Sequence, residues 1–168
     1  DIEFVKYLVE QCHADVNIKD RNEQSLLHIA AEKNNIDIVK YLIEQCHTDV
    51  NAKDIFRQTP LHIASKNGQI EVVKYLVEQC HANVEAENNN GWTPLHIASK
   101  YGQIEVVKYL VEQCQANIKT ISREAIFNAT KKGDIEFVKY LVEQCHADVN
   151  AKDIFRQTLL HIAAEKNS

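Results

Sequence analysis

The chain has 168 residues, of which 45% are hydrophobic and 26% are charged, and its formal net charge is −5. This acidic balance lacks the basic surface that nucleic-acid binding requires, and no apolar run reaches the roughly 18 residues of a membrane-spanning helix. We therefore expect no nucleic-acid partner and no membrane insertion.

One six-residue motif recurs along the chain. Thr-Pro-Leu-His-Ile-Ala stands at 59–64 and again at 93–98, with looser copies at 25–30 and 158–163 and a degenerate copy at 124–129. The motif histidines His28, His62, His96 and His161 lie 34, 34 and 65 residues apart. Such a period predicts a stack of small units that bury a core only against their neighbours.

Each unit predicts two helices and a turn, which residues 59–92 illustrate. Thr59 is expected to cap a short helix that begins with Pro60 and ends at Gly68. The spacing of Ile70, Val73, Leu76 and Val77 predicts a second amphipathic helix, which ends near residues 79–81. A polar turn at 88–91 leads to the next unit.

In chain order, we expect a single domain over residues 1–168 that is built from consecutive repeats. Its parts are a half repeat at 1–24, repeats at 25–58, 59–92, 93–123 and 124–157, and a half repeat at 158–168. Residues 1–17 and 134–150 are identical, which indicates a copied block and a fragment of a longer array.

A helix–turn–helix unit with a protruding turn, the Thr-Pro-Leu-His-x-Ala motif and a period of 33–34 residues resembles the ankyrin repeat. Tetratricopeptide repeats share the period, but they lack the Asp-Val-Asn turn found at 15–17, 49–51 and 148–150. The resemblance implies an all-α ankyrin-repeat solenoid of helix-turn-helix units with protruding β-turn or hairpin loops.

The chain departs from this family pattern in three ways. His13, His47, His81 and His146 stand near the glycine position after the second helix, and Glu23, Arg57 and Arg156 replace the turn glycine present as Gly91. We expect the histidines to tolerate positive φ, and the glycine-free turns to be strained or to take another geometry. The third departure is the link 118–124, which is three residues short and predicts a stunted turn; Phe127 follows in place of the motif histidine.

No residue pattern predicts catalysis. The resemblance implies that the motif histidines hydrogen-bond locally and tie a turn to a helix, and no nucleophile or carboxylate pair accompanies them. The five cysteines, Cys12, Cys46, Cys80, Cys114 and Cys145, share one slot of the repeat and do not converge, so we expect reduced thiols in a cytoplasmic protein, without metal. We expect no enzyme activity and no cofactor.

Two ladders of side chains admit more than one interpretation. His13 and its equivalents either cap helix ends or confer mild pH sensitivity. The tyrosines at 7, 41, 75, 109 and 140 either pack against neighbouring helices or form a surface on which a ligand stacks.

The resemblance implies a protein-interaction scaffold or adaptor that binds its partner with turn tips and the helix 1 face of a concave surface. The predicted contact residues are Ile55, Phe56, Gln58, Lys66, Asn67, Asn89, Asn90, Trp92, Lys100 and Tyr101. Alternatively, Ile55 and Phe56 fold back on the next turn, or Trp92 packs between repeats. A second hypothesis is an architectural spacer that associates head to tail through uncapped ends, since joining 166–168 to 1–4 nearly recreates 131–137.

Overall fold

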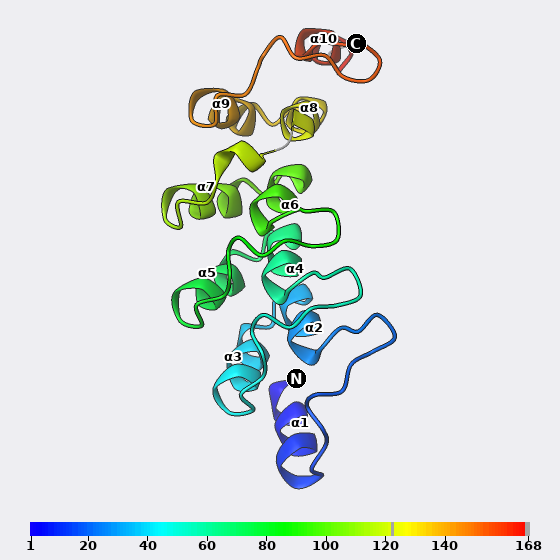
Figure 1. Ribbon diagram of the computed structural model, residues 1–168, viewed down its shortest axis with the longest axis vertical. Helices are drawn as coiled ribbons and strands as arrows, with labels where there is room; N and C mark the ends of the chain where they lie inside the picture. Colours follow the sequence, from blue (N-terminus) through cyan, green and yellow to red (C-terminus); the bar gives the residue numbers. More distant parts are fainter. Residues whose placement is uncertain (122, 167–168) are drawn as a thin grey trace. The chain divides into compact units, whose positions relative to one another are not determined.

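The computed structural model describes residues 1–121 and 123–166, and every regular element in that part of the chain is helical (Figure 1). The all-α repeat architecture predicted from the sequence is therefore confirmed. The chain divides into two compact units, residues 1–94 and 95–168.

The first unit contains five α-helices and one π-helical turn. They are α1 (Ile2–Lys6), the π-helical η1 (Tyr7–Gln11), α2 (Leu26–Glu32), α3 (Ile36–Glu44), α4 (Pro60–Asn67) and α5 (Ile70–Glu78). Helix α2 packs on α3 and α4, and α4 packs on α5. The helix pair α2–α3 thus packs against the helix pair α4–α5, as expected for repeats that share a core.

The second unit repeats this arrangement with one irregular joint. Its helices are α6 (Pro94–Tyr101, whose first residue closes the first unit), α7 (Ile104–Glu112), the 3-10 turn η2 (Ile118–Thr120), α8 (Arg123–Lys132), α9 (Ile135–Glu143) and α10 (Leu159–Lys166). Helix α8 packs on both α9 and α10.

Helix α4 begins and ends as its sequence predicts. The Thr59 hydroxyl accepts a hydrogen bond from the His62 backbone N–H, and Pro60 occupies the first helical position. Gly68 ends the helix in the left-handed conformation, with φ +71°. In α5, Val73 and Leu76 are fully buried as predicted, but Val72 is buried as well, since both α3 and α4 pack on α5.

Left-handed residues other than glycine end the helices and shape the turns. His13, His47, His81 and His146 have φ between 53° and 55°, which confirms the sequence expectation. The turn residues Glu23, Arg57 and Arg156 have φ of 58°, 58° and 64°, close to the 71° of Gly91. These turns therefore keep the glycine geometry, at the steric cost that a Cβ atom brings there.

The short link after α7 takes the place of a protruding turn. Ile118 to Thr120 form the single 3-10 turn η2, and the backbone N–H of Ile121 closes it onto the carbonyl of Ile118 at 3.0 Å. The stunted turn expected here is therefore present, although Ser122 within the link lies outside the described residues.

Candidate interaction surface

The protruding turns of the first unit are organised by one side chain each. The carboxylate of Asp54 accepts hydrogen bonds from the backbone N–H groups of Phe56 at 2.9 Å and Gln58 at 2.8 Å. The amide oxygen of Asn88 does the same for Asn90 and Trp92, at 2.9 and 3.0 Å. Because these turns recur with Asp or Asn at one position, the turn geometry does not depend on the residues at the tip.

Neighbouring turns of this unit are joined through their backbones. The N–H of Ile55 donates to the carbonyl of Asn22 at 3.0 Å, and the N–H of Asn89 donates to the carbonyl of Phe56 at 2.9 Å. The Asn89 side chain adds a bond to the carbonyl of Ile55 at 3.2 Å. The tips are therefore held in fixed register to one another.

Two large apolar side chains stand on this ordered tip. Ile55 is 45% exposed and Phe56 is 56% exposed, so neither is folded away against the next turn. Trp92, by contrast, is half-buried. An exposed aromatic group on a rigid support is typical of protein contact sites, where such groups contribute most of the binding energy.

The motif histidines connect each helix to the following turn. The Nδ1 atom of His62 accepts from the backbone N–H of Thr59 at 3.1 Å, and Nε2 lies 3.0 Å from the carbonyl oxygen of Trp92. His28 bridges Ser25 and the carbonyl of Gln58 in the same way, at 3.2 and 3.0 Å. Since a carbonyl only accepts, Nε2 carries the proton and the ring is neutral.

The burial of these rings keeps them uncharged. Both His28 and His62 are fully buried, and burial lowers the pKa of each imidazole below its ordinary value of 6.5. The backbone bonds to Gln58 and Trp92 oppose this shift without cancelling it. The local structural role that the resemblance implied for these two histidines is confirmed.

Comparison with known protein families agrees with this architecture. A family model of three consecutive ankyrin repeats matches residues 1–85 and 46–122, and a model of one ankyrin repeat matches residues 125–154. The chain belongs to the ankyrin repeat family. No curated protein matches it significantly. Ankyrin repeats are generally protein–protein interaction modules and are typically non-enzymatic.

The other predicted contact residues of the first ankyrin unit line its turns and one helix end. Asn67 is exposed and its side chain donates to the carbonyl of Ile63 at 3.1 Å, while Lys66 beside it is half-buried. Gln58 is half-buried and its carbonyl is held by His28, so its backbone supports the turn. Asn89 and Asn90 are exposed at the next tip.

Lys100 and Tyr101 belong to the second unit. Tyr101 is 42% exposed at the end of α6, and its carbonyl accepts from Lys132 Nζ at 2.9 Å. The Lys100 ammonium lies 3.5 Å from a carboxylate oxygen of Glu124, so part of its charge is already balanced.

The most exposed apolar tip lies outside the predicted contact set. Ile154 and Phe155 are 89% and 76% exposed, although the turn 151–158 repeats the sequence of 52–59. The sequence feature that indicates this exposure is the short link 118–124. It leaves no protruding turn before the one that carries Ile154 and Phe155.

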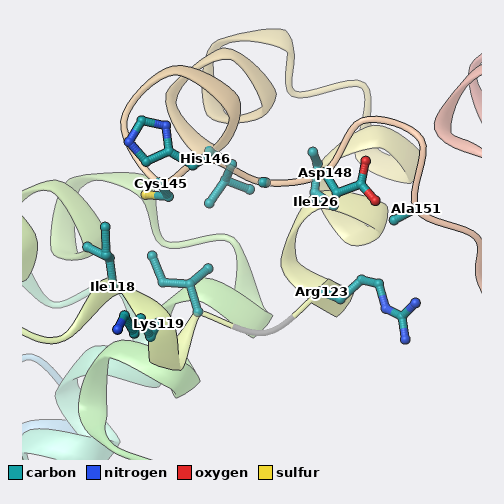
Figure 2. A pocket seen from close by; sticks show the side chains of 11 residues that line it. Ile118, Lys119, Arg123, Ile126, Cys145, His146, Asp148 and Ala151 are labelled. Carbon is teal, nitrogen blue, oxygen red and sulfur yellow. The ribbon is translucent and has the colours of Figure 1, made fainter.

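A cavity of about 290 Å³ lies between the short link and the end of α9 (Figure 2). Figure 2 shows Cys145 and His146 on one side of it and Ile126 and Asp148 on the other. Corresponding hollows lie between the turn stems of the first unit, where Asn51 and other polar residues line them. The cavity at the short link is therefore a variant of a hollow that recurs with the repeat, made more apolar by its isoleucines.

Neither the cysteines nor the tyrosines form a reactive site in the described part. The five cysteines form no disulfide with one another, and burial raises the pKa of Cys46, Cys80 and Cys145. The Tyr41 hydroxyl donates to Glu10 at 3.0 Å, and burial followed by this carboxylate raises its pKa to about 12. The Tyr75 hydroxyl donates to Glu44 at 2.7 Å, so these two rings make lateral contacts between second helices.

Among residues 1–121 and 123–166, no three histidine, cysteine or carboxylate side chains are grouped as metal ligands would be. Over the same residues, no helix has both the length and the apolar character needed to cross a bilayer.

Proposed function

We propose that this ankyrin array recognises a partner protein through its turn tips and the adjoining residues of the first helices. The proposed contacts are those predicted from the sequence: Ile55, Phe56, Gln58, Lys66, Asn67, Asn89, Asn90, Trp92, Lys100 and Tyr101. The observation that carries the proposal is the exposure of Ile55 and Phe56 on a turn that hydrogen bonds fix from within and from both neighbouring turns.

Rigid support of these side chains favours binding. A tip held by Asp54 and by the neighbouring turns loses little conformational freedom when a partner docks, so more of the contact energy remains as affinity. Phe56 also supplies apolar area with only two rotatable bonds, which limits the entropy lost on contact. We take residues 1–168 as one such module with the repeat boundaries predicted above.

The proposal can be tested by photo-crosslinking at a single position. A photoreactive phenylalanine analogue at position 56 should crosslink a partner from a cell lysate, and the same analogue at exposed Glu71 on α5 serves as the matched control. Capture by an affinity-tagged chain should be lost in the Ile55→Ala/Phe56→Ala variant, with the urea unfolding midpoint unchanged. Equal crosslinking at positions 56 and 71 would remove the basis for this surface.

A second candidate function is architectural, with copies of the chain associating end to end. The observation that favours it is the exposed apolar face of α1 and η1: Phe4 on α1 is 63% exposed and Tyr7 on η1 is 58% exposed. On α10, Leu160 is 81% exposed. An apolar face of this kind is covered when a second copy stacks against it.

Light scattering at increasing protein concentration distinguishes the two functions. End-to-end association predicts a mass that rises with concentration, and a Phe4→Glu/Leu8→Glu variant that stays monomeric. Ile18→Glu, at another exposed apolar residue, is the control. A constant monomer mass for the unaltered chain would eliminate the architectural function.

A further inference from the structure

A groove of about 610 Å³ runs beside α8 in the second unit. Residues Arg123, Phe127 and Lys131 line it from the helix, and the turn residues 152–155 line its other side. The first unit contains the same turn sequence at 53–56, beside α2.

The turn tip at Ile154 in the second unit has no preceding turn beside it. In the first unit, the Ile55 N–H donates to the carbonyl of Asn22 on the preceding turn at 3.0 Å. In the second unit η2 replaces that preceding turn, and the Ile154 N–H has no acceptor within the described residues. Ile154 is 89% exposed where Ile55 is 45% exposed. One strand-like edge of the turn is therefore open to a ligand.

The floor of the groove is apolar because a histidine is missing. His28 connects α2 to the carbonyl of Gln58 at 3.0 Å. Phe127 occupies the equivalent place on α8 and has no donor for the carbonyl of Gln157. The bond that joins α8 to this turn is instead donated by Arg123 Nη1 to the carbonyl of Lys152, at 3.4 Å at the margin of the groove. Phe127 is among the residues that line the groove, and it is 6% exposed.

The charge of the groove differs between the copies as well. Arg123 and Lys131 on α8 stand where the α2 repeat has Gln24 and Glu32. Of the acidic groups, Glu124 lies 3.5 Å from the Lys100 ammonium. The Asp153 carboxylate accepts two backbone N–H groups, each at 2.9 Å.

The lining of the groove thus carries three cations and the two carboxylates Glu124 and Asp153, a formal charge of +1 in a chain whose net charge is −5. Together with Lys152 on the turn, the α8 cations give the groove three basic side chains. Such a local field attracts and orients acidic ligands.

We propose that this groove binds an extended, acidic peptide segment of a partner protein, and this inference rests on the proposed recognition function. The segment supplies a backbone carbonyl to the Ile154 N–H and an apolar side chain to the space over Phe127 and beside Phe155. Its carboxylates face Lys131 and Lys152. The peptide thereby takes the place of the turn that the short link lacks.

The test uses peptides as the probe. A displayed library of random 12-residue peptides is selected on the full chain, and the enriched peptides are synthesised with a fluorescent label and titrated by anisotropy. We expect the enriched sequences to combine Asp or Glu with large apolar residues. The Lys131→Glu/Lys152→Glu variant should bind them at least about tenfold more weakly, and rising salt should weaken binding to the unaltered chain.

Matched controls make each outcome decisive. Lys53→Glu changes the counterpart of Lys152 in the first unit and should leave peptide affinity unchanged. Three outcomes would overturn the proposal. The enriched peptides could lack acidic residues, the double variant could bind them with unchanged affinity, or a labelled single-stranded RNA 12-mer could bind this groove more tightly than the peptides do. Phe56→Ala reports separately on the recognition surface of the first unit, so failure there is distinguishable from failure here.

Discussion

Residues 1–17 and 134–150 have the same sequence but differ in structure. In the second copy, α9 is a continuous α-helix over Ile135–Glu143, whereas in the first copy α1 ends at Lys6 and continues as the π-helical turn η1. Phe137 is fully buried and its counterpart Phe4 is 63% exposed.

The neighbouring helix accounts for this difference. Helix α9 packs on α8, which covers Phe137 and Leu141, while the same face of the first copy is exposed at Phe4 and Leu8. A segment this short has little helical stability of its own and depends on packing for its geometry. The comparison therefore teaches that the repeat sequence specifies a helix only together with a partner surface.

The largest expected effect comes from truncating the buried ring. Phe137→Ala should destabilise the chain by about 3–5 kcal/mol, because it leaves a cavity in the core, whereas Phe4→Ala should change stability by about 0.5 kcal/mol or less. Urea unfolding followed by circular dichroism measures both variants. Equal destabilisation by the two changes would mean that the α1 face is packed in solution.

A second repeated segment extends the comparison to the motif histidine. Residues 26–34 recur at 159–167; His28 is fully buried, whereas His161 is exposed. His28→Ala should cost about 1–3 kcal/mol because it unpairs the backbone groups of Ser25 and Gln58. His161→Ala should be nearly neutral in the same unfolding assay, and a comparable loss there would contradict the comparison.

The two buried motif histidines, His28 and His62, give a pH dependence with a defined sign. Burial lowers the pKa of His28 and His62 in the folded state, so the unfolded chain binds more protons below pH 6.5. Stability from these groups is fully present above that pH and is lost as the pH falls toward the folded pKa values. The urea concentration at the unfolding midpoint should be lower at pH 5.5 than at pH 7.5. This difference between the two pH values should be smaller in the His28→Gln/His62→Gln variant, whereas the His161→Gln variant should keep it.

Hydrogen exchange should separate the two helix copies directly. Backbone amides of residues 7–11 should exchange at least about tenfold faster than those of 140–144, because a π-helical turn whose Leu8 is exposed opens at lower cost than a helix whose Leu141 is buried. Peptides from the two copies differ at Ile18 and Ala151, so mass spectrometry can assign them. Equal protection would show that η1 is as stable as the α9 copy.

The smallest expected effect concerns the two equivalent thiols. Cys12 is exposed, while Cys145 is half-buried and its pKa is raised by burial. Maleimide should therefore label Cys12 several-fold faster at neutral pH, since the thiolate is the reactive form. When urea unfolds the chain, the labelling rates of Cys12 and Cys145 should become equal. A rate difference that persists in urea would come from the flanking sequence and not from burial.

Sequence periodicity predicted the repeat, the helix ends and the left-handed histidines, because these depend on local chemistry. Thr59, Pro60 and Gly68 act as their types suggest, and so does Phe127 as an apolar replacement. The π-helical turn at Tyr7–Gln11 could not be predicted, since the same residues in the second copy, 140–144, form the end of the α-helix α9 and its C-cap.

The contact surface was harder to predict from the sequence than the fold. Ile55 and Phe56 were predicted as tip residues, and their exposure agrees with that prediction; their role in binding stays a prediction. The groove beside α8 was not predicted, because it results from the loss of a turn and of a histidine in different places of the chain. Only their juxtaposition in space makes it a candidate site.

The single Asp or Asn that organises each turn has a consequence for how such a chain changes over generations. Because Asp54 and Asn88 bind N–H groups two and four residues onward, the intervening side chains are not required for the turn to form. A point mutation at position 55 or 56 therefore alters which surface is presented without a loss of architecture. Duplicated repeats can acquire new specificities one residue at a time while they inherit an unchanged framework.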